Sequence, residues 1–264
     1  MEQYPLSHSE LMELRRWNTP TIYNGWEAVA PRDRLECALS NDAINDYMPQ
    51  MGAMVGYAVT VEYICADRKT REDNPDCYLN LYRYLAGIPG PKVFLAKDLD
   101  APDSVGSIFG EVTANAYRSL GCVGAITDGF VRDVDEGSYA GFKMMAKRLG
   151  VGHAYSCPLH FGREIELYGA RVKPGMLVHA DKYGFIAVPP EETKYLLAGA
   201  RYMDSNECKT TIVAGRETLG LSAAMVAEQL GRAMEQFGKN SDRFRSAVQA
   251  GESCLPQPQG IGFQ

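Results

Sequence analysis

With 264 residues, 45% of them hydrophobic, the chain is long enough to bury a full core and is most simply one domain with elaborated ends. A net charge of −6 argues against a dedicated nucleic-acid surface, because binding to phosphates relies on clustered Lys and Arg. No apolar stretch reaches membrane-spanning length, and residues 1–20 lack the basic start and apolar run of a signal peptide, so we expect a cytoplasmic protein with no membrane partner.

The hydrophobic pattern alternates between helical and strand periodicity along most of the chain. In chain order, it predicts helices at 8–17 and 36–48, strands at 54–65 and 92–99, a helix at 104–120, a strand at 123–131, a helix at 140–149, strands at 153–159, 164–172, 176–180 and 184–188, and a helix beginning at 189–192. This order indicates an α/β fold whose mixed sheet is parallel in the middle and hairpin-like later.

The C-terminal part adds one strongly patterned segment. Residues 219–238 place Val226, Leu230, Met234 and Phe237 on one stripe, which predicts an amphipathic helix. Packing within the chain and packing at an oligomer interface explain such a stripe equally well. The last residues, 253–264, contain two prolines, two glycines and no charge, and we expect an extended arm or disorder there.

The most informative stretch is 110–136. Gly110 and Glu111 open a helix that Gly121 ends, and an apolar strand at 123–131 follows. That strand delivers Arg132 and Asp133 at its carboxyl end, which is where open α/β sheets bind ligands.

These residue types suit the binding of a metal and an anion. Asp133 offers a hard oxygen ligand of the kind that holds Mg²⁺, and the planar fork of Arg132 suits a carboxylate or a developing enolate. Glu111 sits beside the free N–H groups of Val112 and Thr113 at a helix start, which favour a bound carboxylate. The alternative is that Arg132 and Asp133 form a surface ion pair and Glu111 only complements the helix dipole.

The letters GE at 110–111 and GCVGAITDGFVRDVDE at 121–136 resemble the signature of one known family. That family joins the regulator of ribonuclease activity A to the divalent-metal 4-hydroxy-4-methyl-2-oxoglutarate/4-carboxy-4-hydroxy-2-oxoadipate aldolases. Further segments resemble it in the same order, and the resemblance spans about residues 11–200. These further segments are LRRWNTPTIYNGWE at 14–27, MVGYAVTVEY at 54–63 and VKPGMLVHADKYGFIAVPPEE at 172–192. The first of them is similar to the family's opening helix and strand.

The resemblance implies a swivelling β/β/α sandwich and a role for each matched position. It implies that Asp133 binds Mg²⁺ or Mn²⁺, that Arg132 binds the pyruvyl group, and that Glu111 is the acid that works through metal-bound water, although Glu111 is one methylene longer than the usual Asp. The backbone after Gly110 would hold the substrate carboxylate, and Glu136 fits an acidic position that could reach the metal through water.

The resemblance also implies a layout and an assembly. Residues 1–204 would form the family domain, with 67–91 as an insertion, followed by a helical extension at 205–252 and a flexible tail at 253–264. Family members form trimers, or hexamers built from two trimers, so we expect a homo-oligomer.

Two classes of function remain open at this point. The first is a class II lyase that cleaves a small 4-hydroxy-2-oxo acid to pyruvate and an oxo acid, with oxaloacetate decarboxylation as a side activity, or a dehydratase or other 2-oxo acid lyase using the same site. The second is a non-catalytic protein that binds and regulates a ribonuclease. An acid at Glu111 favours the lyase, because the regulator has no need of it.

Overall fold

The computed structural model describes residues 4–262, which form two compact units. The first unit ends at Thr19 and resumes over Leu35–Glu191. The second consists of Pro20–Arg34 and the chain from Glu192 onward, so a short early segment belongs with the C-terminal helices. The sequence-based layout with a boundary at residue 204 stays a prediction.

The first unit contains the strands and the shorter helices. In chain order, its elements are α1 (His8–Leu14), η1 (Arg34–Glu36), β1 (Ala38–Leu39), β2 (Asn45–Asp46), η2 (Pro49–Met51), β3 (Met54–Ile64), α3 (Arg68–Asp73), α4 (Cys77–Ala86), β4 (Lys92–Asp98), β5 (Ser107–Phe109), α5 (Glu111–Ser119), β6 (Cys122–Val131), α6 (Val134–Tyr139), β7 (Lys143–Leu149), β8 (Cys157–Phe161), β9 (Ile165–Leu167), β10 (Ala170–Val172), β11 (Leu177–Asp181), β12 (Gly184–Val188) and η3 (Pro190–Glu192).

A ten-stranded mixed sheet organises this unit. Its strand order is β1-β12-β11-β3-β4-β6-β7-β2, with β5 beside β6 and β8 beside β3. Strands β3, β4, β6 and β7 run parallel, as do β5 and β6, whereas β11, β12, β1, β8 and β2 join antiparallel. The predicted α/β class and the mixed sheet, parallel in its middle, are confirmed.

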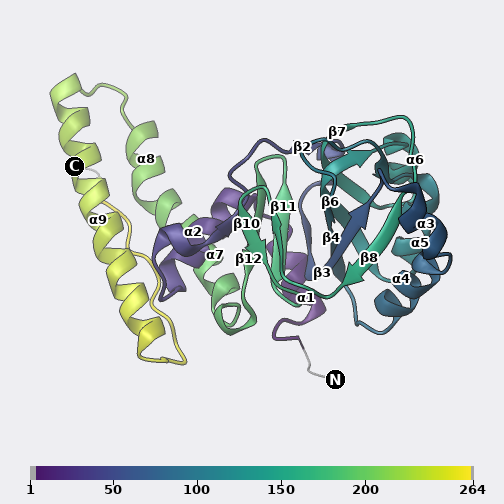
Figure 1. The fold of residues 1–264 in the computed structure, drawn as a ribbon. Helices are drawn as coiled ribbons and strands as arrows, with labels where there is room; N and C mark the ends of the chain where they lie inside the picture. Colours follow the sequence, from purple (N-terminus) through teal and green to yellow (C-terminus); the bar gives the residue numbers. More distant parts are fainter. Residues whose placement is uncertain (1–3, 263–264) are drawn as a thin grey trace. The chain divides into compact units, whose positions relative to one another are not determined.

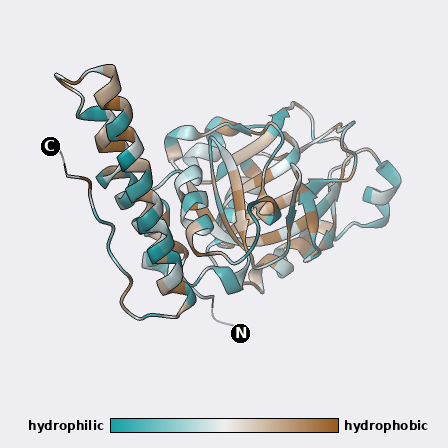
Figure 2. Ribbon diagram, turned by 90° about the vertical axis from the view of Figure 1, so that its left-hand side faces the viewer, coloured by the Kyte–Doolittle hydropathy of each residue, from teal (hydrophilic) through white to brown (hydrophobic). Residues whose placement is uncertain are grey.

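The parallel strands are buried on both faces, as sheets covered on both sides require. On β4, the side chains of Phe94 and Ala96 pack in an aromatic core with Phe109 and Tyr117. The side chains of Val93 and Leu95 point to the other face of the sheet, where they pack in a second core against the β9–β10 hairpin. Helices α3 to α6 lie together on one side of strands β3, β4 and β6 (Figure 1). The hydrophobic residues concentrate on the strands (Figure 2).

Two predicted helices are wrong. Residues 36–48 form short strands instead, because Ala38 and Leu39 pair with the edge of β12 and Asp46 pairs with β7. Residues 140–149 contain strand β7, because parallel pairing with β6 buries Met144 and Met145 on opposite faces. In both cases tertiary pairing overrides a local pattern that was compatible with a helix.

Several other boundaries move for identifiable reasons. The helix predicted at 104–120 begins only at α5, because Ser107–Phe109 pairs with β6. The single strand predicted at 164–172 is a two-strand hairpin, turned by Tyr168 and Gly169 at positive φ. The strand expected within 14–27 is replaced by helix α2 (Thr19–Val29), and the helix expected from 189 is the 3₁₀ turn η3 followed by α7 (Leu196–Lys209).

The second unit is helical. Besides α2 and α7 it contains α8 (Thr211–Arg216) and the predicted long helix, α9 (Ala223–Gln249), which Ser222 caps by accepting from the Met225 N–H. The buried face of α9 includes polar residues, and the Asn240 amide donates to Asn206 Oδ1 at 2.7 Å. Of the predicted stripe, Leu230 and Met234 stay exposed.

The tail has no regular structure up to residue 262, yet it is held by hydrogen bonds. Asn240 Nδ2 donates to the Gln259 carbonyl at 2.9 Å, and the Ile261 N–H donates to the Lys209 carbonyl at 3.3 Å. An extended segment was expected here; residues 263–264 lie outside the described part of the chain. Within residues 4–262, no helix combines the length and the apolar composition that a membrane crossing requires.

Candidate active site at the carboxyl ends of the strands

Strand β6 ends in a backbone turn that aims Arg132 and Asp133 at one place. The Arg132 N–H donates to the Phe109 carbonyl at 3.0 Å, which continues the pairing with β5. Asp133 then adopts a left-handed conformation (φ 53°, ψ 44°) and precedes α6. Asp accepts this region more readily than most residues, because its short polar side chain tolerates it. The strand pairing therefore ends at Arg132, and the chain turns at Asp133 into α6.

The Asp133 carboxylate is fixed by its neighbours. Its Oδ2 accepts from the Glu111 backbone N–H at 3.0 Å and lies 3.5 Å from Arg132 Nε. Gly110 makes this approach possible, because a Cβ there would lie 2.6 Å from Oδ2 and 3.1 Å from Arg132 Cγ. The predicted residues Gly110, Glu111, Arg132 and Asp133 therefore converge.

Helix α5 offers its first turn to the same place. The Thr113 hydroxyl accepts from the Gly110 N–H and donates to the Gly110 carbonyl, each at 2.9 Å, so Thr113 caps the helix. Among described residues, no acceptor contacts the N–H groups of Val112 and Thr113, and no partner contacts the exposed Glu111 carboxylate. The helix start can therefore bind an anion.

These groups line a pocket of about 660 Å³. Gly110, Glu111, Val112 and Thr113 contribute to it together with Arg132 and Asp133. This volume is typical of small-molecule sites.

The opposite wall was not anticipated from the sequence. It includes Arg71 from α3, Tyr78 from α4, and His153 with Ser156 from the loop before β8. The Tyr78 hydroxyl lies 3.0 Å from Ser156 Oγ, and burial raises the pKa of Tyr78 to about 12 although this hydrogen bond opposes the shift. Tyr78 therefore stays a neutral hydroxyl at neutral pH. Arg71 and Tyr78 fall in the segment 67–91 that was expected to be an insertion, and His153 and Ser156 fall in the strand predicted at 153–159, which begins only at Cys157 as β8.

Glu136 lies elsewhere. It is exposed on α6 and is not among the described residues that line the pocket. That Glu136 reaches a metal through water stays a prediction.

The donor set around Asp133 fits a hydrated divalent cation. Within residues 4–262, no group of three or more His, Cys, Asp or Glu side chains could enclose a metal. Mg²⁺, however, commonly uses one or two carboxylates and keeps several waters. Asp133 is about one-third exposed, its Oδ1 contacts no described partner, and the Glu111 carboxylate lies on the adjoining helix start. Asp133 therefore offers one carboxylate oxygen to such an ion, and water would supply most of the other ligands.

The structure is an α/β protein with a mixed sheet, whose central parallel strands end beside an Asp-Arg pair and a helix start. The chain belongs to the RraA-like family, whose Aldolase/RraA description matches residues 26–187. Members of this family are either lyases, including metal-dependent aldolases, or ribonuclease regulators.

Solved structures share the fold at low identity. An uncharacterized protein from Pseudomonas syringae pv. tomato is 18% identical with a TM-score of 0.64, over 86% of this chain and 97% of the other. A protein described as a novel cellulase from gut-associated microbes is 19% identical with a TM-score of 0.63, over 79% and 90%. Streptomyces coelicolor RraAS2, described as an unusual member of the RNase ES inhibitor RraA family, is 17% identical with a TM-score of 0.56, over 76% and 93%. No curated protein matched the chain.

Proposed function

We propose that the chain is a divalent-metal-dependent lyase that cleaves a small 4-hydroxy-2-oxo acid into pyruvate and a second oxo acid. One observation carries the proposal. The carboxylate of Asp133, the guanidinium of Arg132 and the first turn of α5 meet at one pocket, with Gly110 leaving the room they need.

Each residue has a role that its position supports. When bound at Asp133, Mg²⁺ or Mn²⁺ supplies Lewis-acid polarisation of the 2-oxo group. The N–H groups of Val112 and Thr113 bind the substrate carboxylate, and the guanidinium of Arg132 stabilises the charge that develops on the enolate oxygen. Both interactions use donors that are already in place.

The bond changes follow from these roles. The Glu111 carboxylate, through water, takes the proton of the 4-hydroxyl group as the C3–C4 bond breaks. The bonding electrons move to C2–C3 as an enolate, C4 becomes the carbonyl of the released oxo acid, and protonation at C3 gives pyruvate. Loss of carbon dioxide from oxaloacetate yields the same enolate, so we propose decarboxylation as a side activity.

We propose that the opposite wall of the pocket determines which substrate is accepted. Arg71, Tyr78 and His153 line the same pocket, and we propose that they offer a cation, a neutral hydroxyl and an imidazole to the part of the substrate beyond the reacting carbons. A dehydratase or another 2-oxo acid lyase would use the same wall with a different leaving group.

A ribonuclease regulator is the second candidate. The likeness to Streptomyces coelicolor RraAS2 and the net charge of −6, which suits a basic partner, favour it. The lyase is favoured by Glu111, whose backbone N–H binds Asp133 and whose carboxylate has no partner among the described residues.

Pyruvate release decides between the two. The full chain is incubated with 4-hydroxy-4-methyl-2-oxoglutarate or oxaloacetate, with Mg²⁺, with Mn²⁺ and with EDTA. The lyase proposal requires pyruvate that depends on added metal and disappears with EDTA. Absence of pyruvate from every oxo acid under metal-replete conditions would reject it and favour the regulator.

We also propose a homo-oligomer, a trimer or a hexamer, because the exposed side chains of Leu230 and Met234 on α9 form an apolar surface that a partner subunit would cover. Light scattering tests this. Met234→Glu should reduce the mass, whereas Val105→Glu, at an exposed position of the first unit, serves as the control. A monomeric full-length chain would contradict the proposal.

A further inference from the structure

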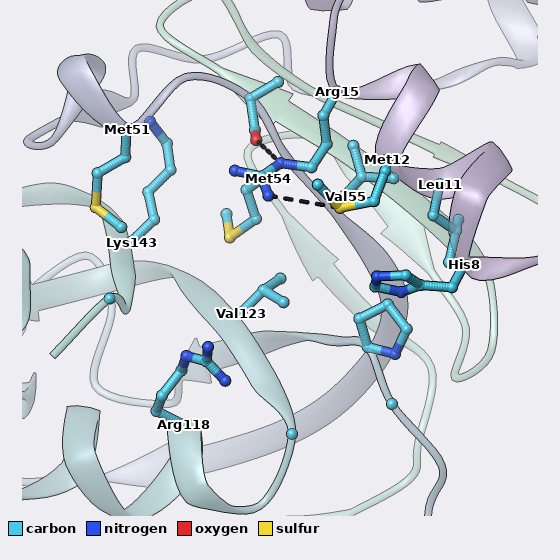
Figure 3. A pocket seen from close by; sticks show the side chains of 15 residues that line it. His8, Leu11, Met12, Arg15, Met51, Met54, Val55, Arg118, Val123 and Lys143 are labelled. Atoms are coloured by element: carbon cyan, nitrogen blue, oxygen red, sulfur yellow. Dashed lines mark hydrogen bonds between the residues drawn. The ribbon is translucent and has the colours of Figure 1, made fainter.

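We propose that the amino ends of the same parallel strands form a second ligand site, which binds an organic carboxylate with an apolar body. The site is a pocket of about 470 Å³ between α1, the last turn of α5 and the starts of β3, β6 and β7 (Figure 3). It lies at the opposite end of β6 from Asp133, so the inference does not depend on the proposed lyase activity.

The lining of this pocket is cationic. His8, Arg15, Arg118 and Lys143 contribute to it, and the described residues that line it include no Asp or Glu. Lys143 is compensated, because its Nζ lies 2.6 Å from Asp46 Oδ2 and both side chains are almost fully buried. Two guanidinium groups remain without a carboxylate partner among the described residues, in a chain whose net charge is −6.

The two guanidinium groups line the same cavity. Arg15 is oriented by its Nε, which donates to the Ala53 carbonyl at 3.0 Å. Arg118 extends from the last turn of α5 and has no described hydrogen-bond partner. Figure 3 shows the two side chains entering the cavity from opposite sides, with Met54 and Val123 between them. Guanidinium groups bind carboxylates through two parallel hydrogen bonds.

A buried ammonium group adds to this positive region. Lys92, at the start of β4, is 2% exposed, and its Nζ donates to the carbonyls of Leu85 at 2.9 Å and Ile88 at 2.6 Å. It lies directly behind the pocket wall, because its Nζ is 3.5 Å from the point where a Cβ on Gly121 would sit. No carboxylate contacts it among the described residues, so an anion in the pocket would face a third cation.

The rest of the lining is apolar. Leu11, Met51, Met54, Val55 and Val123 form much of the floor and walls. An inorganic anion would leave this apolar surface in contact with water, whereas a carboxylate with a short hydrocarbon chain covers it and gains from the burial of its CH₂ groups. The volume is also in the range of small-molecule sites.

Binding of hexanoate, observed by ligand-detected NMR on the full chain, tests the inference. We expect hexanoate to bind, 1-hexanol and acetate to bind at least about tenfold more weakly, and inorganic phosphate not to displace hexanoate. Arg118→Gln should weaken hexanoate binding about tenfold or more, and Arg118→Lys should give an intermediate loss, because charge is kept but the planar fork is lost.

Arg83→Gln is the matched control, since Arg83 occupies the last turn of α4, is exposed and does not line the pocket. It should bind hexanoate as the unchanged chain does. Circular dichroism melting establishes that each variant is folded. The inference is overturned if hexanoate does not bind at about 10 mM, if folded Arg118→Gln binds it normally, or if phosphate competes as well as hexanoate does.

Discussion

The two ends of strand β6 differ in how charge is arranged. At the carboxyl end, Asp133 contacts both the Arg132 guanidinium and the Glu111 N–H, so opposite charges are held close together and partly open to solvent. At the amino end, Arg15 and Arg118 face an apolar floor without any carboxylate among the lining residues described. A site with mixed charge suits a reaction in which charge moves, whereas a site of one sign suits capture of a fixed anion.

Asp133→Ala gives the largest effect expected at the carboxyl end. Loss of the oxygen ligand should reduce metal-dependent turnover by at least about 100-fold while the melting temperature stays close to normal, because the side chain is not in the core. Steady-state pyruvate release measures it. Asp135→Ala, an exposed acid in the first turn of α6, is the control and should keep full activity. Normal turnover of the Asp133 variant would remove that residue from the site.

Gly110→Ala should come next, with a loss of roughly 10- to 100-fold in kcat/KM. The added Cβ would lie 2.6 Å from Asp133 Oδ2, so the carboxylate must move away from the Glu111 N–H. Gly152→Ala is the matched change, because a Cβ there meets nothing within 4 Å. Equal kinetics for the two alanine variants would show that the close approach has no functional role.

Arg132→Lys should lower kcat/KM about tenfold although the charge is retained, because an ammonium group cannot reproduce the planar fork. Arg83→Lys provides the comparison on an exposed helix end. If Arg132→Lys behaves like this control, Arg132 contributes only charge to the carboxyl-end site.

The smallest effect concerns the support of the amino-end pocket. His179 Nε2 donates to the Leu14 carbonyl at 3.2 Å, and its Nδ1 accepts from the Thr19 hydroxyl at 2.9 Å, so the imidazole ties α1 to β11. Burial lowers the pKa of His179 from 6.5 to about 4, against the opposing effect of Asp181. The group is therefore neutral in the folded chain where it would be protonated in the unfolded one.

The neutral state of His179 in the folded chain determines how stability changes with pH. Between pH 6.5 and about 4 the unfolded state binds more protons, so stability is complete above pH 6.5 and is lost as pH falls through this window. We expect the protection of α1 amides from hydrogen exchange to fall by roughly 1–2 kcal/mol over this range, and that of β6 to fall less. His179→Gln should flatten the dependence for α1. An unchanged slope in that variant would show that another group is responsible.

The sequence predicted the carboxyl end of the parallel strands better than the rest of the fold. The stretch 110–136 was readable because an acid, a glycine and an apolar strand follow one another locally. The turn after one strand and the start of one helix were enough to expect these groups to converge, but the hydrogen bond from the Glu111 N–H to Asp133, 22 residues apart, was not predicted.

Other parts depended on partners that are distant in sequence. The local pattern of residues 143–149 is compatible with a helix, and only pairing with β6 makes this segment the strand β7. Strand β1 has two residues, and they pair with β12, nearly 150 residues later in the chain. Tyr78 reaches the pocket from helix α4 and His153 from the loop before β8, and no short sequence spacing relates the two residues. The buried face of α9 was not predicted for a similar reason, since Asn240 is buried by pairing with Asn206 of α7.

The origin of the two pocket walls has a consequence for protein engineering. The groups that we propose to react lie at the start of α5 and after β6, whereas Arg71 and Tyr78 come from α3 and α4, a stretch that contributes no strand to the sheet. If the proposed function holds, chemistry and selectivity are encoded in separate pieces of the chain. Grafting a different α3–α4 segment between β3 and β4 should change which oxo acid is accepted without rebuilding the machinery that breaks the bond.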